Sequence, residues 1–249
     1  MTTYGYQLYS SRNFPPLDTT LGMLAEAGYT HVEGYGAMFS TAAAAADLRG
    51  QLDAAGLTMP TAHMGLDFVE SDPHLAVEIA QTLGITTAFA PYLNAPDRPK
   101  DAAGWRAFAD RLVAAGAPLR AAGLGYGWHN HDFEFAELAD GTLPMAALAD
   151  ADLPLELDVA WVIKGGQDPA AWIDRAGDKL VAVHVKDIAP EGQTTEEDGW
   201  ADVGHGTVDW SGLLTHLRGT PANYFIMEHD NPNDHRRFAT RSIAAAQTF

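Results

Sequence analysis

The chain has 249 residues, enough to bury one large core, and its 33 acidic and 15 basic residues give it a formal net charge of −18. A charge of this sign and size disfavours binding to nucleic acid or to an anionic membrane surface, so we expect a small uncharged ligand. The absence of cysteine excludes disulfides, thiolate zinc sites and a cysteine nucleophile.

No segment of the chain is typical of a targeting signal or a membrane span. The first residues do not show the pattern of a signal peptide, a basic region followed by an apolar run. No apolar run approaches the ~18 residues that a transmembrane helix needs. We therefore expect a cytoplasmic protein that forms a single domain over residues 1–249.

In chain order, short apolar runs alternate with helical segments. The predicted strands are Tyr4–Ser10, His31–Gly36, Thr58–Met64, Ile85–Tyr92, Gly125–His131, Pro154–Trp161, Leu180–Lys186 and Tyr224–Glu228. The predicted helices are Asp18–Ala27, Thr41–Ala55, His74–Leu83, Asp101–Ala122, Leu143–Ala149, Pro169–Ala176, Trp210–Leu217 and His235 to the C-terminus. Many of these helices end at or just before a glycine, as helix ends prefer.

Alternating strands and helices in one domain of this length predict an α/β fold, a single (β/α)₈ barrel of the TIM type. A doubly wound sheet is the alternative, but the glycine-rich nucleotide turn typical of that fold is not present. Residues 188–207 form the longest stretch without periodicity. Because this segment follows a strand, it lies on the face where barrel active sites sit. We interpret it as a lid, with a floppy insertion as the alternative.

Polar side chains follow several of the predicted strands. They are His129 and His131 at the end of the fifth strand, Glu134 just after it, Asp158 at the end of the sixth, His184 in the seventh and Glu228 at the end of the eighth. Strands of a parallel barrel are buried on both faces, and a polar group there is costly unless it is paired or bound to a metal. Carboxylates with an imidazole suit Mn²⁺ or Mg²⁺, and also Zn²⁺ or Co²⁺.

The segment after the fifth strand reads His129-Asn130-His131-Asp132-Phe133-Glu134-Phe135 and matches a His-Asn-His-x-x-Glu-Phe signature. With this signature and the strand-end residues, the chain resembles from end to end the sugar phosphate isomerase/epimerase family, which has a xylose isomerase-like TIM barrel. The resemblance implies one divalent metal ion, commonly Mn²⁺. In the family, carboxylates of the fifth, sixth and eighth strands and a histidine of the seventh bind this ion.

Carried over to this sequence, the resemblance implies that the metal ligands are Glu134, Asp158, His184 and Glu228. In ketose epimerases of the family, a glutamate occupies the position that His129 has in this chain. To bind the metal here, Glu134 therefore has to reach back across a bulged strand end. The open alternatives are a solvated loop acid for Glu134, a helix cap for Asp158, a core histidine for His184, and His229 or Asp230 in place of Glu228.

Two carboxylates on opposite sides of a substrate can remove and return a proton, and Glu134 and Glu228 suit that pair. We expect His131 and His129 to bind substrate or transfer a proton, the alternative being a hydrogen bond to a ligand carboxylate.

Glu33, His63 and Lys186 fall at strand ends on the same face and are predicted to bind substrate. For Glu33 and His63 the alternative is hydrogen bonding at the rim, and for Lys186 it is a salt bridge with Asp187. The aromatic residues proposed as an apolar wall for a sugar ring are Tyr9, Tyr35, Trp128 and Trp161. The basic residues near the loops are Arg12, Arg98, Lys100 and Lys164, and their small number favours an unphosphorylated substrate.

The resemblance implies isomerisation or epimerisation of a sugar through an enediolate. It also implies a second outcome, β-elimination on 3-keto sugars or 3-keto-glycosides by a lyase or hydratase, because both reactions begin with the same proton abstraction. A non-catalytic sugar-binding protein is a further alternative. An endonuclease IV-like enzyme is disfavoured by the charge and because the extra His and Glu ligands of a zinc cluster are not evident. Relatives are often homo-oligomers.

Overall fold

The computed structural model describes residues 4–249. Its parallel strands close into a barrel in the order β1-β2-β3-β4-β5-β6-β7-β10, and β10 pairs again with β1. The bounds of these strands are β1 (Tyr4–Gln7), β2 (His31–Tyr35), β3 (Thr58–His63), β4 (Thr87–Ala90), β5 (Gly125–His129), β6 (Leu155–Asp158), β7 (Leu180–Val185) and β10 (Tyr224–Met227). The predicted (β/α)₈ barrel is confirmed.

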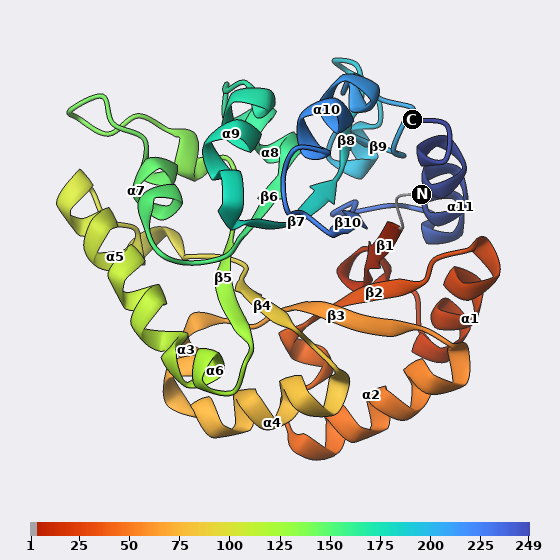
Figure 1. Cartoon of the computed structure of the whole chain (residues 1–249). Coiled ribbons are helices and arrows are strands. Elements are labelled where there is room, and N and C mark those ends of the chain that lie inside the picture. The colour runs from red at the N-terminus through yellow and green to blue at the C-terminus, as the bar shows by residue number, and fades with distance from the viewer. Residues whose placement is uncertain (1–3) are drawn as a thin grey trace.

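Helices surround the barrel and cover the outer faces of its strands (Figure 1). They are α1 (Leu17–Ala27), α2 (Ala42–Ala55), α3 (Leu66–Ser71), α4 (Pro73–Leu83), α5 (Ala102–Ala115), α6 (Ala117–Ala121), α7 (Pro144–Asp150), α8 (Val159–Lys164), α9 (Pro169–Ala176), α10 (Trp210–Leu217) and α11 (His235–Ala246). The main core lies between these helices and the strands, where a continuous cluster of apolar side chains is buried. Among residues 4–249, no helix has the length and apolar character needed to cross a membrane.

Several element boundaries differ from the prediction for local reasons. The predicted strand Pro154–Trp161 ends at Asp158, because the Asp158 carboxylate accepts the Trp161 N–H at 2.9 Å and begins α8. The predicted helix Asp101–Ala122 is interrupted at Gly116, and Pro118 lies in the first turn of the next helix. Helix α3 was not predicted.

The first predicted strand is also shorter, since Leu8–Ser11 turn into the 3₁₀ helix η1. Between β5 and β6 the backbones come so close that a side chain on Gly127 would collide with the Pro154 carbonyl. The Trp128 N–H donates to that carbonyl at 3.1 Å. Glycine at this position therefore allows β5 to carry its histidines to the mouth of the barrel.

The segment that follows β7 has its own structure. The short strands β8 (Asp187–Ile188) and β9 (Trp200–Ala201) pair antiparallel. The buried Asp187 carboxylate accepts backbone N–H groups from residues 188, 204, 206 and 208. Arg237 of α11 holds Glu197 and Asp202 of the segment by ion pairs at 2.7 and 3.1 Å. These contacts favour an ordered segment over a floppy insertion.

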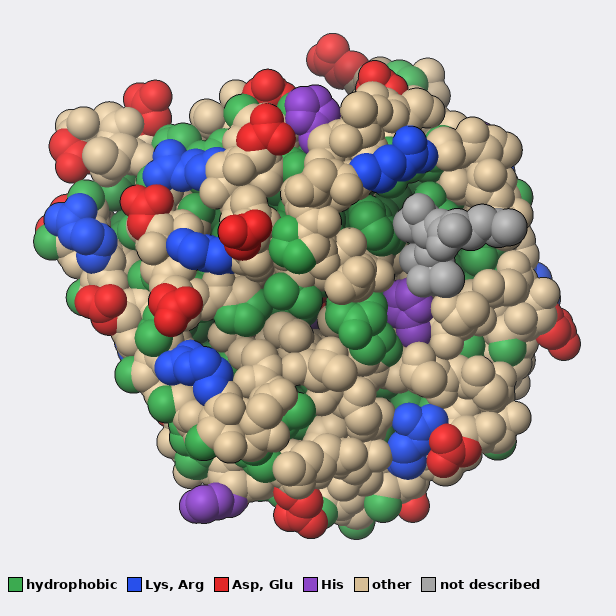
Figure 2. All heavy atoms as spheres, viewed as in Figure 1, with side chains coloured by type: hydrophobic (Ala, Val, Ile, Leu, Met, Phe, Trp, Pro, Cys, Tyr) green, Lys and Arg blue, Asp and Glu red, His purple; other side chains and the backbone are tan. Residues whose placement is uncertain are grey.

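Acidic side chains also outnumber basic ones on the surface. On the face shown in Figure 2, lysine and arginine side chains are scattered among aspartate and glutamate and do not gather into one patch. This distribution agrees with the net charge of −18 and offers no basic stripe on that face for a phosphate backbone.

Candidate active site and metal centre

A cavity of about 600 Å³ opens at the end of the barrel where the strands finish. It is lined by Tyr9, Arg12, Tyr35, Gly36, His63, Gly65, Pro91, Tyr92, His129, His131, Trp161, Asp198, Glu228 and Asp230. Asp198 belongs to the segment after β7, so this segment borders the site. The C-terminal ends of the strands are where barrel enzymes carry their active sites.

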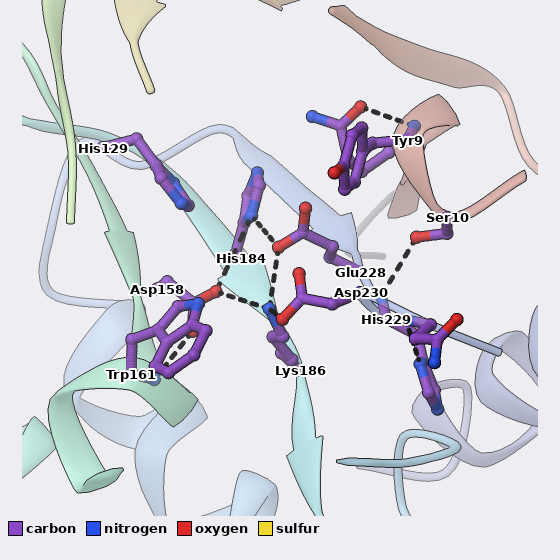
Figure 3. A network of polar contacts seen from close by, with 12 residues as sticks. Tyr9, Ser10, His129, Asp158, Trp161, His184, Lys186, Glu228, His229 and Asp230 are labelled. Carbon is purple, nitrogen blue, oxygen red and sulfur yellow. Dashed lines mark hydrogen bonds and ion pairs between the residues drawn. The ribbon is translucent and has the colours of Figure 1, made fainter. Parts of the chain in front are cut away.

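At the floor of this cavity, four side chains from four strands converge (Figure 3). His129, Asp158, His184 and Glu228 are buried, and each offers a donor atom within 4.8 Å of the others. His184 Nδ1 lies 2.9 Å from Glu228 Oε2 and 3.9 Å from Asp158 Oδ2. We refer to these residues as the ligand set. Three of them, Asp158, His184 and Glu228, were predicted as metal ligands.

Local structure fixes two members of this set. Asp158 and His184 are register partners of the parallel strands β6 and β7. The Asn130 side chain bonds the Asp158 backbone twice, since its amide donates to the Asp158 carbonyl at 3.1 Å and its oxygen accepts the Asp158 N–H at 2.9 Å. Asn130 therefore ties the end of β5, with His129, to the end of β6.

Two unsatisfied atoms indicate that the ligand set fits a cation. Within residues 4–249, Asp158 Oδ2 and His129 Nδ1 are buried and make no hydrogen bond. His129 Nδ1 lies 3.2 Å from Glu156 Oε2, without hydrogen-bond geometry. Burial and the neighbouring His184 lower the pKa of His129 to about 3, so this imidazole stays neutral. A neutral imidazole is the form that binds metal, and two imidazoles with two carboxylates suit a divalent ion such as Mn²⁺ or Zn²⁺.

Lys186 contacts the same carboxylates. Its Nζ lies 2.7 Å from Asp230, 3.2 Å from Glu228 and 3.5 Å from Asp158. Burial alone lowers the pKa of Lys186, but the carboxylates of Asp230, Glu228 and Asp158 outweigh it and raise the pKa above its ordinary value. The side chain is fully buried and does not line the cavity. Lys186 is thus a fixed positive charge beside the ligand set.

A second layer of polar side chains lies against the other edge of His184. His184 Nε2 is 2.7 Å from Glu33 Oε1 and 3.2 Å from Glu156 Oε2, and Gln7 donates to Glu33 Oε1 at 2.7 Å. His63 Nε2 is 2.7 Å from Glu156 Oε2. A carboxylate on the far nitrogen of a ligand histidine orients its ring.

This deeper layer changes two sequence-based interpretations. Glu33 was predicted to bind substrate, but it is fully buried and does not line the cavity, whereas His63 does. The extra His and Glu side chains that were not evident from sequence are present, since His63, His129, Glu156 and His184 form a second possible metal-binding group. The two groups share His129 and His184, which favours one ion with oriented ligands over two independent ions.

Glu156 was missed by the sequence reasoning, although the signal was available. Residues two apart in a strand point to the same side. Glu156 precedes Asp158 by two residues in Leu155-Glu156-Leu157-Asp158, so both acids face the barrel interior, while the two leucines belong to the apolar core.

Glu134 does not join the ligand set. It lies in the 3₁₀ turn η4 (Phe133–Phe135), and its two carboxylate oxygens accept the Trp128 indole N–H at 2.8 Å and the His131 backbone N–H at 2.9 Å. Burial raises the pKa of Glu134 to about 8. The geometry therefore does not support Glu134 as the first metal ligand or as a base facing the substrate, and His129 lies beside Asp158, His184 and Glu228 instead. Trp128, predicted to line a sugar wall, does not line the cavity and instead packs against Phe108.

This position leads to a testable difference in stability. Glu134→Ala is expected to lower the free energy of unfolding by about 2–6 kcal/mol, because two buried N–H donors lose their acceptor and each costs ~1–3 kcal/mol. Urea denaturation measures this change, and metal analysis of the folded variant is expected to find the wild-type content. A folded, stable Glu134→Ala protein that has lost its metal would restore Glu134 as a ligand.

The other predicted residues at the mouth are brought together. His131 lies with its ring 5.0 Å from that of His129, and both line the cavity. Burial lowers the pKa of His131 well below its ordinary value, and within the described residues its buried Nδ1 has no partner. Tyr9, Tyr35 and Trp161 line the cavity as predicted.

Comparisons with known proteins agree with this architecture. A family model described as a xylose isomerase-like TIM barrel matches residues 21–247. No curated protein sequence matches the chain significantly. A sugar phosphate isomerase/epimerase from Parabacteroides distasonis has a similar structure, with a TM-score of 0.81 and 22% identity over 99% of this chain and 93% of that one.

Two other solved structures are also similar. A probable 3-DHS dehydratase from Bacillus anthracis has a TM-score of 0.75 and 13% identity over 99% of each chain. A 3-keto-D-glucoside 4-epimerase from E. coli has a TM-score of 0.72 and 18% identity over 100% of each chain. At these identities the likeness establishes the fold alone.

Proposed function

Because the chain belongs to the xylose isomerase-like TIM barrel family, we propose that it is a divalent-metal-dependent enzyme that removes a proton next to the carbonyl of a sugar or keto-sugar. Isomerisation or epimerisation through an enediolate is the expected outcome. The observation that carries this proposal is the buried ligand set at the floor of an open cavity, with Asp158 Oδ2 and His129 Nδ1 left without hydrogen-bond partners among the described residues.

His129, Asp158, His184 and Glu228 would hold the ion. When bound, a divalent ion supplies a Lewis acid that polarises the substrate carbonyl, an effect worth several kcal/mol. Mn²⁺ is our first choice, with Mg²⁺, Co²⁺ or Zn²⁺ as alternatives.

The proton-transfer groups follow from which side chains reach the cavity. Glu228 and His131 both line it, and we assign both as bases: either can take the proton from the substrate, and the group that has taken it can return it from its protonated form. The neutral His131 imidazole has a free buried nitrogen within the described structure, as a base requires. Lys186 stabilises negative charge near Glu228. His63 hydrogen-bonds a substrate hydroxyl.

The basic residues near the site favour an unphosphorylated substrate. Arg12 Nη1 donates to the Tyr9 and Asp230 carbonyls at 3.0 and 2.5 Å. Arg98 donates to the Leu93 carbonyl and to the Tyr92 hydroxyl. Part of each guanidinium is therefore already engaged with protein oxygens, which leaves fewer donors for a phosphate.

A second candidate reaction is β-elimination from a 3-keto-glycoside, as a lyase or hydratase performs it. The position of Glu134 favours it, because Glu134 is bound to Trp128 and His131 and the expected pair of opposed carboxylates is reduced to Glu228. In this reaction His131 or Glu228 takes the proton from C2, the C–H electrons form the C1–C2 double bond, and the C1–O bond breaks. The departing oxygen takes a proton and leaves as the free aglycone.

The test is incubation in D₂O with Mn²⁺ of a free ketohexose and, separately, a 3-keto-glucoside. Mn²⁺ is removed by chelation before proton NMR, because it broadens the spectra. We expect solvent deuterium next to the carbonyl, with an epimer or isomer from the primary reaction or free aglycone from the second. Absence of deuterium from both substrates together with absence of free aglycone, in protein shown to contain metal, would leave a sugar-binding protein without catalysis.

A further inference from the structure

Two exposed tyrosines mark the rim of the cavity. Among residues 4–249, the large hydrophobic side chains that remain exposed are Tyr9, at 38%, and Tyr92, at 50%. Tyr9 follows β1 and Tyr92 follows β4, yet both line the same cavity. Exposed apolar side chains that lie together at one cavity indicate a site that a bound ligand covers.

The tyrosines continue into aromatic walls. Tyr9 packs edge-on against Tyr35, with ring centroids 5.4 Å apart. On another part of the wall, Tyr92 packs edge-on against His131 at 5.0 Å, and His131 lies 5.4 Å from Trp161. In the view of Figure 3, Tyr9 and Trp161 lie on either side of the Glu228 and Asp230 carboxylates. Aromatic rings therefore stand around the polar floor.

The cavity has more room than the chemistry at its floor requires. Its volume of about 600 Å³ lies within the range of ~300–1,000 Å³ that holds drug-sized ligands. His63, His129 and Glu228, which are assigned to hold the ion and the sugar, are polar and line the cavity. A cavity of this volume has room for a second ring beside a single sugar ring.

Charge determines which kind of group the rim accepts. Arg12 is the one basic side chain that lines the described cavity, whereas Asp198, Glu228 and Asp230 are acidic. The Arg12 guanidinium lies 3.9 Å from the centre of the Tyr9 ring and bonds the Asp230 carbonyl. The excess of carboxylates disfavours an anionic group, and the aromatic faces favour a flat or ring-shaped neutral one.

We propose that Tyr9, Tyr35, Tyr92 and Trp161 form a second subsite that binds the neutral aglycone ring of a glycoside. The proposed function supplies one premise, that the sugar ring lies on the floor at His63, His129 and Glu228. The aglycone ring then stacks on the aromatic rim, and its apolar face covers the exposed Tyr92 ring. The substrate class is a glycoside with a second ring, in place of a free monosaccharide.

The experiment compares the binding of phenyl and methyl D-glucopyranosides, each as both anomers, to metal-loaded protein by calorimetry and saturation-transfer NMR. For at least one anomer we expect the phenyl glycoside to bind about 10-fold more tightly than the methyl glycoside, with strong saturation of the phenyl protons. Tyr92→Ala is expected to reduce this preference about 5-fold or more. Tyr92→Phe keeps the ring and is expected to keep the preference.

Equal affinity for the phenyl and methyl glycosides, or a preference that Tyr92→Ala leaves intact, would overturn the subsite. Because this readout is binding, it does not depend on turnover. A phenyl preference that persists in protein unable to exchange deuterium would contradict the proposed reaction and support the subsite. Deuterium exchange without a phenyl preference would support the reaction and refute the subsite.

Discussion

Asp158→Asn is expected to abolish metal binding and leave the fold intact. Asparagine retains an oxygen that accepts the Trp161 N–H, so the cap of α8 is kept. The other oxygen, Oδ2, has no hydrogen-bond partner within residues 4–249 and is the atom we assign to the metal; the substitution replaces it by an amide nitrogen that cannot ligate. We expect Mn²⁺ affinity to fall by about 100-fold or more, and deuterium exchange to fall with it. Metal analysis, thermal unfolding and the D₂O assay measure these three properties.

A matched control is available in the same chain. Asp168 caps α9 in the same way, since its Oδ1 accepts the Ala170 N–H at 3.0 Å, and it lies away from the cavity. Asp168→Asn is therefore expected to keep metal content and exchange at the level of the unchanged protein. If Asp158→Asn binds Mn²⁺ as tightly as Asp168→Asn does, the assignment of Asp158 fails and the ligand set fails with it.

The fold was predictable because it depends on a repeated pattern. Apolar strands alternate with helices that often end at glycine, and this pattern is legible without any knowledge of contacts. The meeting of Asp158, His184 and Glu228 was predictable for a related reason: each lies at a strand end, and parallel strand ends meet at one face of a barrel. Their positions follow from the topology alone.

Glu134 was not placed correctly because it lies beyond the end of its strand. The period of two that orients strand residues stops at His129, where β5 ends. The 3₁₀ turn then turns the Glu134 carboxylate toward the Trp128 indole. The number of residues between His129 and Glu134 carries no information about this turn. Glu156 was overlooked for the opposite reason, since it lies inside a regular strand where the period applies.

Contacts that join distant parts of the chain were also beyond the sequence. The bonds from Gln7 to Glu33 and from Glu33 to His184 link β1, β2 and β7. The exposure of Tyr92 at the rim depends on how the loop after β4 is arranged. Such facts come from three-dimensional packing, in which each residue has many possible partners of the right type.

Lys186→Met is expected to separate charge stabilisation from metal binding. Methionine keeps an unbranched apolar stem but removes the ammonium from Asp158, Glu228 and Asp230. Breaking a buried ion pair costs ~3–5 kcal/mol, so the metal-free variant is expected to be less stable by about that amount. A bound divalent ion restores positive charge beside the same carboxylates. Addition of Mn²⁺ is therefore expected to raise the unfolding temperature more in the variant than in the unchanged protein.

Deuterium exchange by Mn²⁺-loaded Lys186→Met is expected to fall by about 10²–10³-fold, the usual effect of losing a group that stabilises developing charge. Lys164→Met is the matched control, because Lys164 lies 3.4 Å from the ring centre of the same Trp200 that Lys186 approaches at 4.3 Å. Among the described residues, however, the hydrogen bond of Lys164 is to the Asp198 carbonyl and not to a carboxylate. Full exchange activity in Lys186→Met would show that the lysine serves only to neutralise the carboxylates. Loss of Mn²⁺ from the folded variant would instead mean that the ligand set depends on Lys186 for its geometry. If the variant keeps its Mn²⁺ but loses deuterium exchange, the ammonium group takes part in the reaction.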